Sequence, residues 1–432
     1  MSTTRRPSAV VRGLGAVSPL GVGVPAYIAG LRAGRSGVRL IELRHEMVKS
    51  TVAAQCPEFN PRSTMSDADL GRLPRLVPMA LAAAREALAH AGIPIGDSLD
   101  LDHSRQIGVV LGTGAGGIDF TLEQSENYHA RGIRPSLWTI TNATHGNLAG
   151  ELSIRLGLRG PSLCISTGCA SSSDAIGMAM DLLRSDRPGA PSAMVVVGAD
   201  AHVCFGTLLG MELLRVISTR DFRQDLGNAG TACRPFDRTR DGFVLGEGAW
   251  AAVLTRESWD APSPSKSLGA VLGYGATCDA FHRVRPDPDM LESVRAIHLA
   301  IEDAALAPED VELVNYHGTG TQLNDTVETA AVKQAFGAHA RRLQGSSVKG
   351  AIGHPQGACG LAALVATLGA LTSADDGDAP FVPPTINLRE PDPACDLSYT
   401  PNEARPTDAR TALINCLAFG AKNSALIVRA GP

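Results

Sequence analysis

The stretch Ser166-Thr-Gly-Cys-Ala-Ser-Ser-Ser-Asp174 (STGCASSSD) places one cysteine among small residues just before a pattern of helical period begins. Gly168 permits a tight or unusual backbone turn, and residues 170–184 carry apolar side chains on one helical face. We therefore expect Cys169 at a helix N-terminus, where free amides and the helix dipole stabilise a thiolate and lower the pKa of the thiol. This arrangement predicts a nucleophile. The alternative is a buried, inert cysteine, because free cysteines are among the most buried residues.

Two histidines occur in glycine-rich segments that follow predicted strands. His317 lies in YHGTGTQLND, which starts at Tyr316, and His354 lies in KGAIGHPQGACG, which starts at Lys349. Loops at strand ends are where α/β folds collect functional groups, although a single histidine there is more often structural. Two such histidines together with Cys169 favour a catalytic site.

The composition excludes several classes of protein. The chain has 432 residues, 44% of them apolar, and a net charge of −5 without a basic block, so a nucleic acid or an anionic membrane is not the expected partner. Nine cysteines are scattered without CxxC pairs, which argues against a disulfide framework or a zinc site. The apolar runs are far shorter than the roughly 20 residues that span a bilayer, and the N-terminus has no long apolar region. We expect a cytoplasmic protein that binds no metal.

Strand-like and helical segments alternate along the chain, which is typical of an α/β protein. A polar, Pro-rich break at residues 258–267 separates two predicted halves, 1–257 and 258–432, and residues 375–379 resemble a surface loop. The segments VRGLGAVSPLG and LGAVLGYGATCD share a strand-then-glycine pattern, which suggests an internal duplication. The patterns predict strands at 10–12, 106–111, 193–197, 249–254, 268–274, 311–316 and 412–416, and helices at 76–91, 170–184 and 290–305.

The motifs together resemble the β-ketoacyl synthase family of the thiolase superfamily. They are, in chain order, GLGAVSPLG at Gly13, GLRGPS at Gly157, STGCASSSDAIG at Ser166, RPFDRTRDGFVLGEGA at Arg234, HGTGT at His317, KGAIGH at Lys349 and AFGAKN at Ala418. STGC, the segment VPPTINLREPDPACDLSY and the chain length look most like the ketosynthase (alpha) subunit of bacterial type II polyketide synthases. The resemblance implies two duplicated α/β halves in a five-layered αβαβα core. The first half would carry Cys169 and the second the two histidines.

The resemblance also implies a reaction and its residues. Cys169 would take an acyl group from a carrier protein, and a malonyl-carrier thioester would then lose CO2 and attack that group in a decarboxylative Claisen condensation. His317 and His354, as neutral imidazoles, would donate from Nε2 to the enolate. The backbone N–H groups of Cys169 and Phe419 would form the oxyanion hole. Lys349 would organise this network, with a lysine that merely caps a strand end as the alternative.

Further positions are assigned by the same resemblance to the substrate and to gating. Thr319 and Thr321 would hold the phosphopantetheine arm of the acyl carrier protein, so the chain itself needs no bound cofactor. Phe419 would gate the site. Ala115 would leave space at the back of the acyl pocket for a long, rigid or unsaturated chain such as a polyene, and Met211 would line that pocket. Each of these residues has a plain structural alternative in a turn or in the core.

Three positions depart from the family's pattern. Many relatives have a glutamate where this chain has Ala363, so we expect Lys349 to use Asp325 or Glu328 as its ion-pair partner. The DAFH run from Asp279 continues with Arg-Val-Arg, which removes a hydroxyl near the pantetheine tunnel. The gate loop reads AFGAKN in place of a glycine-rich sequence, so we expect it to be stiffer.

The motifs leave other functions of the same superfamily open. A fatty-acid-type ketosynthase homodimer would carry the same motifs. A non-catalytic chain length factor would lack the nucleophile, and a thiolase would show a Cys-His-Cys pattern, so Cys169 with both histidines favours an active condensing enzyme. The type II resemblance implies an acyl carrier protein as partner, and favours a heterodimer with a chain length factor over a homodimer.

Overall fold

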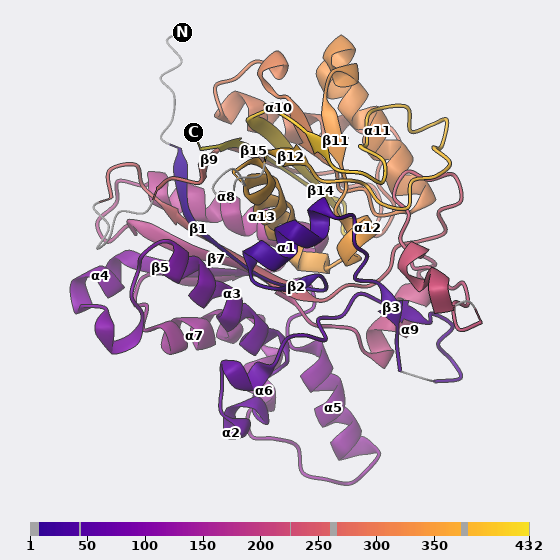
Figure 1. Ribbon diagram of the computed structural model, residues 1–432. Coiled ribbons are helices and arrows are strands. Elements are labelled where there is room, and N and C mark those ends of the chain that lie inside the picture. The colour runs from indigo at the N-terminus through magenta and orange to yellow at the C-terminus, as the bar shows by residue number, and fades with distance from the viewer. Residues whose placement is uncertain (1–7, 43–44, 225, 260–265, 373–378, 432) are drawn as a thin grey trace.

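The fold is known from a computed structural model, which describes residues 8–42, 45–224, 226–259, 266–372 and 379–431 (Figure 1). In these residues eleven strands form one sheet, in the order β11-β10-β14-β15-β9-β1-β8-β7-β5-β6, and β2 (Gly21–Val22) pairs with β1. The strands that precede residue 258 are β1 (Ala9–Ser18), β5 (Ile107–Gly112), β6 (Ser162–Ile165), β7 (Ala193–Asp200) and β8 (Gly248–Thr255). Those that follow it are β9 (Gly269–Cys278), β10 (Leu313–Asn315), β11 (Gln344–Ser346), β14 (Thr411–Ala418) and β15 (Lys422–Ala430).

The two groups of strands repeat one topology. Outward from the junction of β1 and β9, the first group runs β1-β8-β7-β5-β6 and the second runs β9-β15-β14-β10-β11, which is the same order when strands are numbered within each half. In both groups the first two pairings are antiparallel and the outer two are parallel. The predicted duplication is therefore confirmed, and an antiparallel pairing of β1 with β9 joins the two half-sheets into one.

The helices form three layers around the two half-sheets. Figure 1 shows α8 (Ser171–Arg184) and α13 (Cys359–Leu371) at the centre, and the buried residues of both pack between the strands of the two halves. α3 (Leu76–His90) and α7 (His145–Leu156) cover the outer face of the first half-sheet. α10 (Leu291–Asp303) and α11 (Gln322–Phe336) cover the outer face of the second. This is the predicted five-layered αβαβα core.

The smaller elements connect these layers. They are α1 (Val24–Arg32), α2 (Asp67–Leu70), α4 (Leu101–Gln106), α5 (Ile118–His129), α6 (Thr139–Ala143), α9 (Phe205–Leu213), α12 (Lys349–Ile352), β3 (Arg39–Leu40), β4 (Val52–Ala53), β12 (Phe381–Val382) and β13 (Arg405–Pro406). Short 3₁₀ turns at Gly168–Ala170 and Gln356–Ala358 lead into α8 and α13.

The predicted helices and strands coincide with observed elements, with differences at their ends. β1, predicted at residues 10–12, extends to Ser18 because the glycines of GLGAVS pack against the backbone of α3; a Cβ at Gly13 would lie 2.0 Å from the Ala87 carbonyl oxygen. The helix predicted from Ala170 begins at Ser171. Much of the Pro-rich break (residues 260–265) and of the predicted loop (residues 375–378) lies outside the described residues, so the division after residue 257 stays a prediction.

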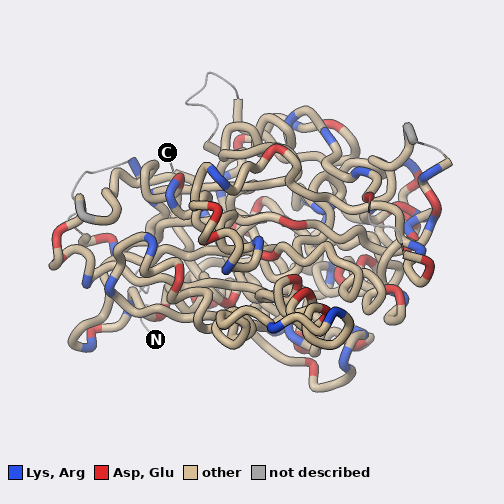
Figure 2. The backbone as a smooth tube through the Cα atoms, turned by 90° about the horizontal axis from the view of Figure 1, so that it is seen from below, with Lys and Arg blue, Asp and Glu red and all other residues tan. Residues whose placement is uncertain are grey.

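No helix among the described residues combines the length and apolar character that crossing a membrane requires. Figure 2 shows acidic and basic residues interspersed around the molecule. The parallel strands matter most for function, because their carboxyl ends share one edge of the sheet. In register, Gly112 of β5 lies opposite Ile165 of β6 and Gly198 of β7, so the loops that follow these strands meet. In the second half β10 and β14 are likewise parallel neighbours, so the loops that follow them also lie at one edge of the sheet.

Candidate active site

Cys169 lies in the 3₁₀ turn directly before α8 and is buried. The turn requires glycine at position 168, where φ is +67° and a Cβ would lie 3.2 Å from the carbonyl oxygen of Phe419. Ser171 locks the turn: its hydroxyl donates to the Gly168 carbonyl (2.6 Å) and accepts from the Thr167 amide (2.9 Å). The predicted position of Cys169 at a helix start is confirmed. The turn packs against the β14–β15 hairpin.

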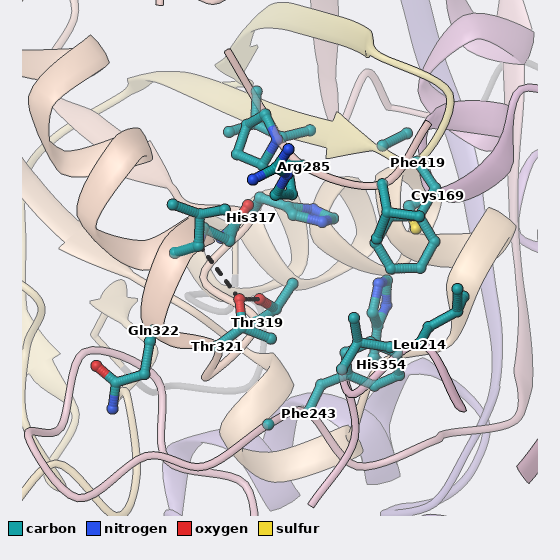
Figure 3. Close-up of a pocket in the computed structure, with 18 of the residues that line it drawn as sticks. Cys169, Leu214, Phe243, Arg285, His317, Thr319, Thr321, Gln322, His354 and Phe419 are labelled. Atoms are coloured by element: carbon teal, nitrogen blue, oxygen red, sulfur yellow. Dashed lines mark hydrogen bonds between the residues drawn. The ribbon is translucent and has the colours of Figure 1, made fainter. Parts of the chain in front are cut away.

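His317 and His354 meet Cys169 in one cavity, as Figure 3 shows. The sulfur and one nitrogen of each ring all lie within 4.8 Å of one another. The two ring centroids are 5.3 Å apart at an interplanar angle of 83°. All three side chains are buried. His317 follows β10 and His354 follows α12, so the second half supplies both imidazoles and the first half supplies the thiol.

Lys349 fixes the proton position on His317. Its ammonium donates to the carbonyl oxygen of His317 (2.6 Å) and lies 3.4 Å from Nδ1 of the same residue. Burial opposes the charge of Lys349 and the neighbouring Glu328 favours it; the pKa of Lys349 is raised overall, so the lysine is charged at neutral pH and has protons to donate. An Nδ1 that accepts from Lys349 leaves the imidazole proton on Nε2, which faces the cavity.

Cys359 has the same relation to His354. Its sulfur lies 3.1 Å from Nδ1 of His354, and burial raises the pKa of the Cys359 thiol well above its ordinary value. A protonated thiol at this distance donates to an unprotonated Nδ1, and in this arrangement His354 carries its proton on Nε2. Sequence reasoning missed this contact. The spacing of five residues between His354 and Cys359 gave no signal, because residues 354–358 follow no regular helix.

Both imidazoles are neutral. Burial lowers the pKa of His317 and of His354 well below the ordinary histidine value, and the charge of Lys349 lowers both further. The sequence prediction of neutral imidazoles that donate from Nε2 thus agrees with the burial and with the hydrogen bonds at Nδ1.

The expected lowering of the Cys169 pKa is wrong for the resting protein. Burial raises the pKa of the Cys169 thiol to about 12, although the backbone amide of Phe419 and the charge of Lys349 act to lower it. A helix start was the correct location, but the sequence did not show how completely the sulfur is removed from water. The thiol is therefore protonated at neutral pH, and it donates toward Oε1 of Gln356 at 3.5 Å.

Two buried carboxyl groups shape the HGTGT loop. Glu328 accepts hydrogen bonds from the amides of His317 (2.6 Å) and Gly318 (2.8 Å), and burial raises its pKa to about 7. Asp325 accepts from the Thr319 amide (3.0 Å) and lies 3.4 Å from the guanidinium of Arg240. Both carboxyl groups come from α11 and hold His317 in place.

The expected ion pair of Lys349 with Asp325 or Glu328 is therefore wrong. Asp325 pairs with Arg240, and Glu328 binds backbone amides of the His317 loop. Among the described residues no carboxylate lies within ion-pair distance of Lys349, which bonds to His317 instead. Ala363 is buried inside α13, where a glutamate side chain would have to be desolvated.

The cavity has a volume of about 330 Å³, is open to the surface and includes Cys169 in its lining. Thr319 and Thr321 line it, and their hydroxyl groups lie 3.1 Å apart (Figure 3). Thr321 also caps α11 by accepting from the Asn324 amide. Arg285, from the segment that departs from the family pattern, projects toward the same opening. Hydroxyl groups in a narrow cavity suit a ligand that carries amides.

Ala115 and Met211 do not line this cavity among the described residues. Ala115 lies in the turn after β5, where its amide donates to Asp200 (3.0 Å). Met211 packs with Phe419 against a small apolar cluster that includes Phe243, a residue of the cavity wall. Their assignment to an acyl pocket stays a prediction.

Phe419 forms the tip of the β14–β15 hairpin, and Figure 3 shows its ring close to Cys169. Gly420 (φ +84°) and Ala421 (φ +62°) both have left-handed backbones, which costs an alanine about 1 kcal/mol. The hairpin is held by two further bonds, from the Gly420 amide to Arg283 and from the Asp279 amide to Ala421. These contacts agree with the expectation of a stiffer loop.

The sulfur and the two imidazoles are also the only group of metal-type ligands found together among the described residues. Three such ligands with an open fourth position resemble a catalytic zinc site in kind. Here, however, the charged Lys349 lies 3.4 Å from His317, and this positive charge opposes a bound cation. The arrangement suits chemistry in which negative charge develops on a substrate.

A thiol at a helix start, two donor imidazoles and a duplicated αβαβα core define a condensing acyltransferase. Comparison with known families agrees: residues 7–259 match the family model of the β-ketoacyl synthase N-terminal domain, and residues 268–389 match that of the C-terminal domain. The chain belongs to the β-ketoacyl synthase family.

Individual relatives fall into two groups. A 3-oxoacyl-[acyl-carrier-protein] synthase 2 of Synechocystis is 36% identical over 99% of both chains, and that of Staphylococcus aureus is 33% identical over 99% of both. Among solved structures, the ishigamide ketosynthase/chain length factor superposes with a TM-score of 0.87 at 31% identity. A type II polyketide ketosynthase in complex with its acyl-carrier protein and bound to a hexaketide superposes with a TM-score of 0.86 at 27% identity. Each of these two structural matches covers 99% of this chain and all of the other.

Proposed function

We propose that this chain is a β-ketoacyl-[acyl-carrier-protein] synthase that condenses an acyl group on Cys169 with a malonyl-carrier thioester in type II polyketide biosynthesis. The observation that carries the proposal is the meeting of the Cys169 sulfur with His317 and His354 within 4.8 Å in one open cavity. A nucleophile and two neutral donors at this distance fit an acyl thioester and a neighbouring enolate in the same space.

In the first half-reaction, the Cys169 sulfur attacks the carbonyl carbon of a carrier-bound acyl thioester. A new C–S bond forms, the bond to the pantetheine sulfur breaks, and the proton of the Cys169 thiol ends on that sulfur. The tetrahedral oxyanion accepts from the backbone N–H groups of Cys169 and Phe419. The charge of Lys349 and the start of α8 stabilise the sulfur while it carries negative charge, which offsets its raised resting pKa.

In the second half-reaction, the malonyl carboxylate leaves as CO2, and the electron pair of the broken C–C bond becomes an enolate. The enolate oxygen accepts from Nε2 of His317 and of His354, and its carbon attacks the acyl carbonyl on Cys169. The thioester bond breaks, the released Cys169 thiolate takes up one proton from solvent, and a 3-oxoacyl chain two carbons longer leaves on the carrier. Neutral donors that are already oriented need no reorganisation when this charge develops.

The remaining residues position the substrate. Lys349 holds the tautomer of His317 through Nδ1. Thr319 and Thr321 offer hydroxyl groups to the amides of the pantetheine arm as it enters. The substrates would bring their own phosphopantetheine on the acyl carrier protein, so the reaction uses no cofactor held by this chain.

The complexes in which the solved relatives occur favour polyketide synthesis over fatty-acid synthesis. They include ketosynthases paired with a chain length factor or an acyl-carrier protein. Fatty-acid-type condensation by a homodimer is the second candidate, favoured by relatives named 3-oxoacyl-[acyl-carrier-protein] synthase 2. A chain-length-factor-like subunit without catalysis is disfavoured, because Cys169 and both histidines share one cavity.

The edge of the sheet at β6 offers a surface for the proposed second subunit. Leu163 on this strand is exposed, and exposed apolar side chains on the neighbouring α6 and α7 include Ile140 and Ile154. An apolar edge strand of this kind is normally covered in a stable protein. We propose a chain length factor as the partner, with a second copy of this chain as the alternative.

Intact-mass spectrometry on the chain co-expressed with candidate partners tests the proposal. Acyl-carrier protein is added first, and acylation of the chain is read as a mass increase; malonyl-carrier protein is added second, and the product length is read. We expect Cys169→Ala to abolish acylation. We expect His354→Ala to be acylated normally but to condense about 100- to 1,000-fold more slowly, because one enolate donor is lost. An unchanged condensation rate in this variant would remove His354 from the mechanism.

A further inference from the structure

Gln356 is a buried amide beside the nucleophile that no step above uses. Its Oε1 lies 3.5 Å from the Cys169 sulfur, and its side chain is only 6% exposed. Its Nε2 is buried without any hydrogen-bond partner among the described residues. Its backbone also has an unfavourable left-handed conformation, with φ of +45°. Backbone strain and an unsatisfied buried donor each cost free energy, and both features concentrate at functional sites.

The backbone around Gln356 is linked through Asp200 to the loop that follows β5. Gln356 does not line that cavity, whereas Cys169 does. The next residue, Gly357, donates its amide to Asp200 (2.7 Å), and the same carboxylate accepts from the amides of Gly114 (2.9 Å) and Ala115 (3.0 Å). The two loops touch so closely that a Cβ at Gly357 would lie 2.2 Å from the Gly114 nitrogen.

This placement determines which part of a substrate meets the amide. The proposed pantetheine arm would occupy the open cavity lined by Thr319 and Thr321, whereas Gln356 lies outside that lining and within 3.5 Å of the sulfur, where it can meet the first carbons of an acyl chain on Cys169. The carbonyl oxygen at C1 is directed to the amides of Cys169 and Phe419. Acylation also removes the thiol proton that Oε1 accepts in the resting protein, which frees the Gln356 amide to turn and present Nε2.

We infer that Gln356 is a specificity-determining residue, which donates from Nε2 to an oxygen at C3 of the acyl chain on Cys169. The site therefore prefers 3-oxoacyl and 3-hydroxyacyl chains to saturated or 2,3-unsaturated chains of the same length. Such chains arise from a condensation that no complete reduction has followed, so the enzyme favours its own product as its next acyl substrate. The inference rests on the proposed acylation of Cys169 and names the class of chain that it accepts.

Four C4 acyl groups on the carrier protein test this preference: acetoacetyl, 3-hydroxybutyryl, butyryl and crotonyl. The rate of Cys169 acylation is followed by intact mass under conditions below saturation. We expect the two 3-oxygenated groups to acylate the wild-type chain about 3- to 10-fold faster, which is the effect of one net hydrogen bond. Gln356→Leu, which keeps the size but removes the donor, abolishes the difference by slowing only the oxygenated pair.

A matched control and a second variant keep the test decisive. Gln124→Leu makes the same change at another buried glutamine, on α5 and outside the cavity lining, and should keep the wild-type preference. Gln356→Met replaces the leucine variant if that variant does not fold. Equal acylation by all four groups in the wild-type chain overturns the inference while leaving the proposed function intact. Failure of every group to acylate Cys169 instead contradicts the proposed function.

Discussion

The sulfur of Cys169 lies among groups that change its charge in opposite directions. Burial disfavours the thiolate, whereas the Phe419 amide and the charge of Lys349 favour it, and burial dominates in the resting protein. The same burial keeps His317 and His354 neutral, and this is the state that donates from Nε2. Removal from water thus makes the thiol less acidic at rest and makes each hydrogen bond to a developing negative charge stronger.

The raised pKa of Cys169 predicts how its alkylation depends on pH. Because the pKa of the thiol is raised to about 12, the thiolate fraction keeps rising through the neutral range. We expect the rate of alkylation by iodoacetamide to increase about tenfold per pH unit between roughly pH 7 and 9. Mass spectrometry of the Cys169 peptide measures this rate. A plateau reached below about pH 8 would show that the helix start outweighs burial.

The contact between Cys359 and His354 predicts a selective effect on condensation. Cys359→Ala removes the donor to Nδ1, so the Nε2–H tautomer is no longer enforced, and we expect condensation to slow about 2- to 10-fold while acylation continues. Cys359→Ser keeps a donor and should recover most of the rate. Single-turnover assays of the two half-reactions separate them.

Cys416→Ala is the matched control for Cys359. This thiol lies in the same small apolar cluster, but it accepts from the Ser173 hydroxyl (3.2 Å) and has no histidine partner among the described residues. Equal losses in both alanine variants would indicate a packing defect and contradict the tautomer argument.

At the scale of elements, loops after strands and before helices carry the site. The turn after β6 holds Cys169, the loop after β10 holds His317, and the β14–β15 hairpin closes over both. Buried carboxylates fix these loops by accepting hydrogen bonds from backbone amides. Asp200 binds the loops around residues 113–115 and 357. Asp325 and Glu328 bind the His317 loop. Such rigid loops hold reacting atoms at a defined distance.

The hairpin provides a prediction about gating. Phe419→Ala removes the ring beside Cys169, and with it the packing of the hairpin tip against the Met211 cluster. We expect the approach of the malonyl carrier to slow by about 10- to 100-fold with a smaller change in its binding, because the tip no longer holds a defined position. Product formation measured over a range of malonyl-carrier concentrations tests this. Equal rates at every concentration would argue against a gate.

At the scale of the whole molecule, the two halves complete one site at their junction. The first half supplies the Cys169 sulfur and the second supplies both imidazoles, and the central layer of α8 and α13 is common to both. Two of the three residues of the edge strand β11 are buried, whereas β6 carries exposed residues and is bordered by exposed apolar side chains. The β6 edge is therefore the surface that we propose for association.

This asymmetry predicts the effect of a charge at the β6 edge. Leu163→Lys places a buried charge in any interface formed there, so we expect the chain to sediment as a monomer, whether its partner is a chain length factor or a second copy. Leu291→Lys is the control, because this exposed leucine begins α10 on the other half of the molecule. Unchanged sedimentation of the Leu163 variant would place the interface elsewhere.

The order of motifs along the chain was enough to predict the fold class, the duplication and the meeting of Cys169 with His317 and His354. Strand and helix patterns are local, and the motifs from Gly13 to Ala418 are spaced as one family requires. Whether a residue follows a strand is likewise a local property of the sequence. Parallel strands bring their carboxyl ends to one edge of the sheet, so residues in the loops after them can be expected to meet. These features could be predicted without coordinates.

Only the tertiary structure decided the chemical state of the site. The partner of Lys349, the donor role of Cys359 and the unsatisfied amide of Gln356 depend on side chains that are far apart in sequence or lie in an irregular turn. The pKa of Cys169 depends on how much water the folded chain excludes, which no helix pattern records. Sequence determines which groups are present and on which elements, whereas hydrogen bonding and desolvation act over a few ångströms and are set by packing.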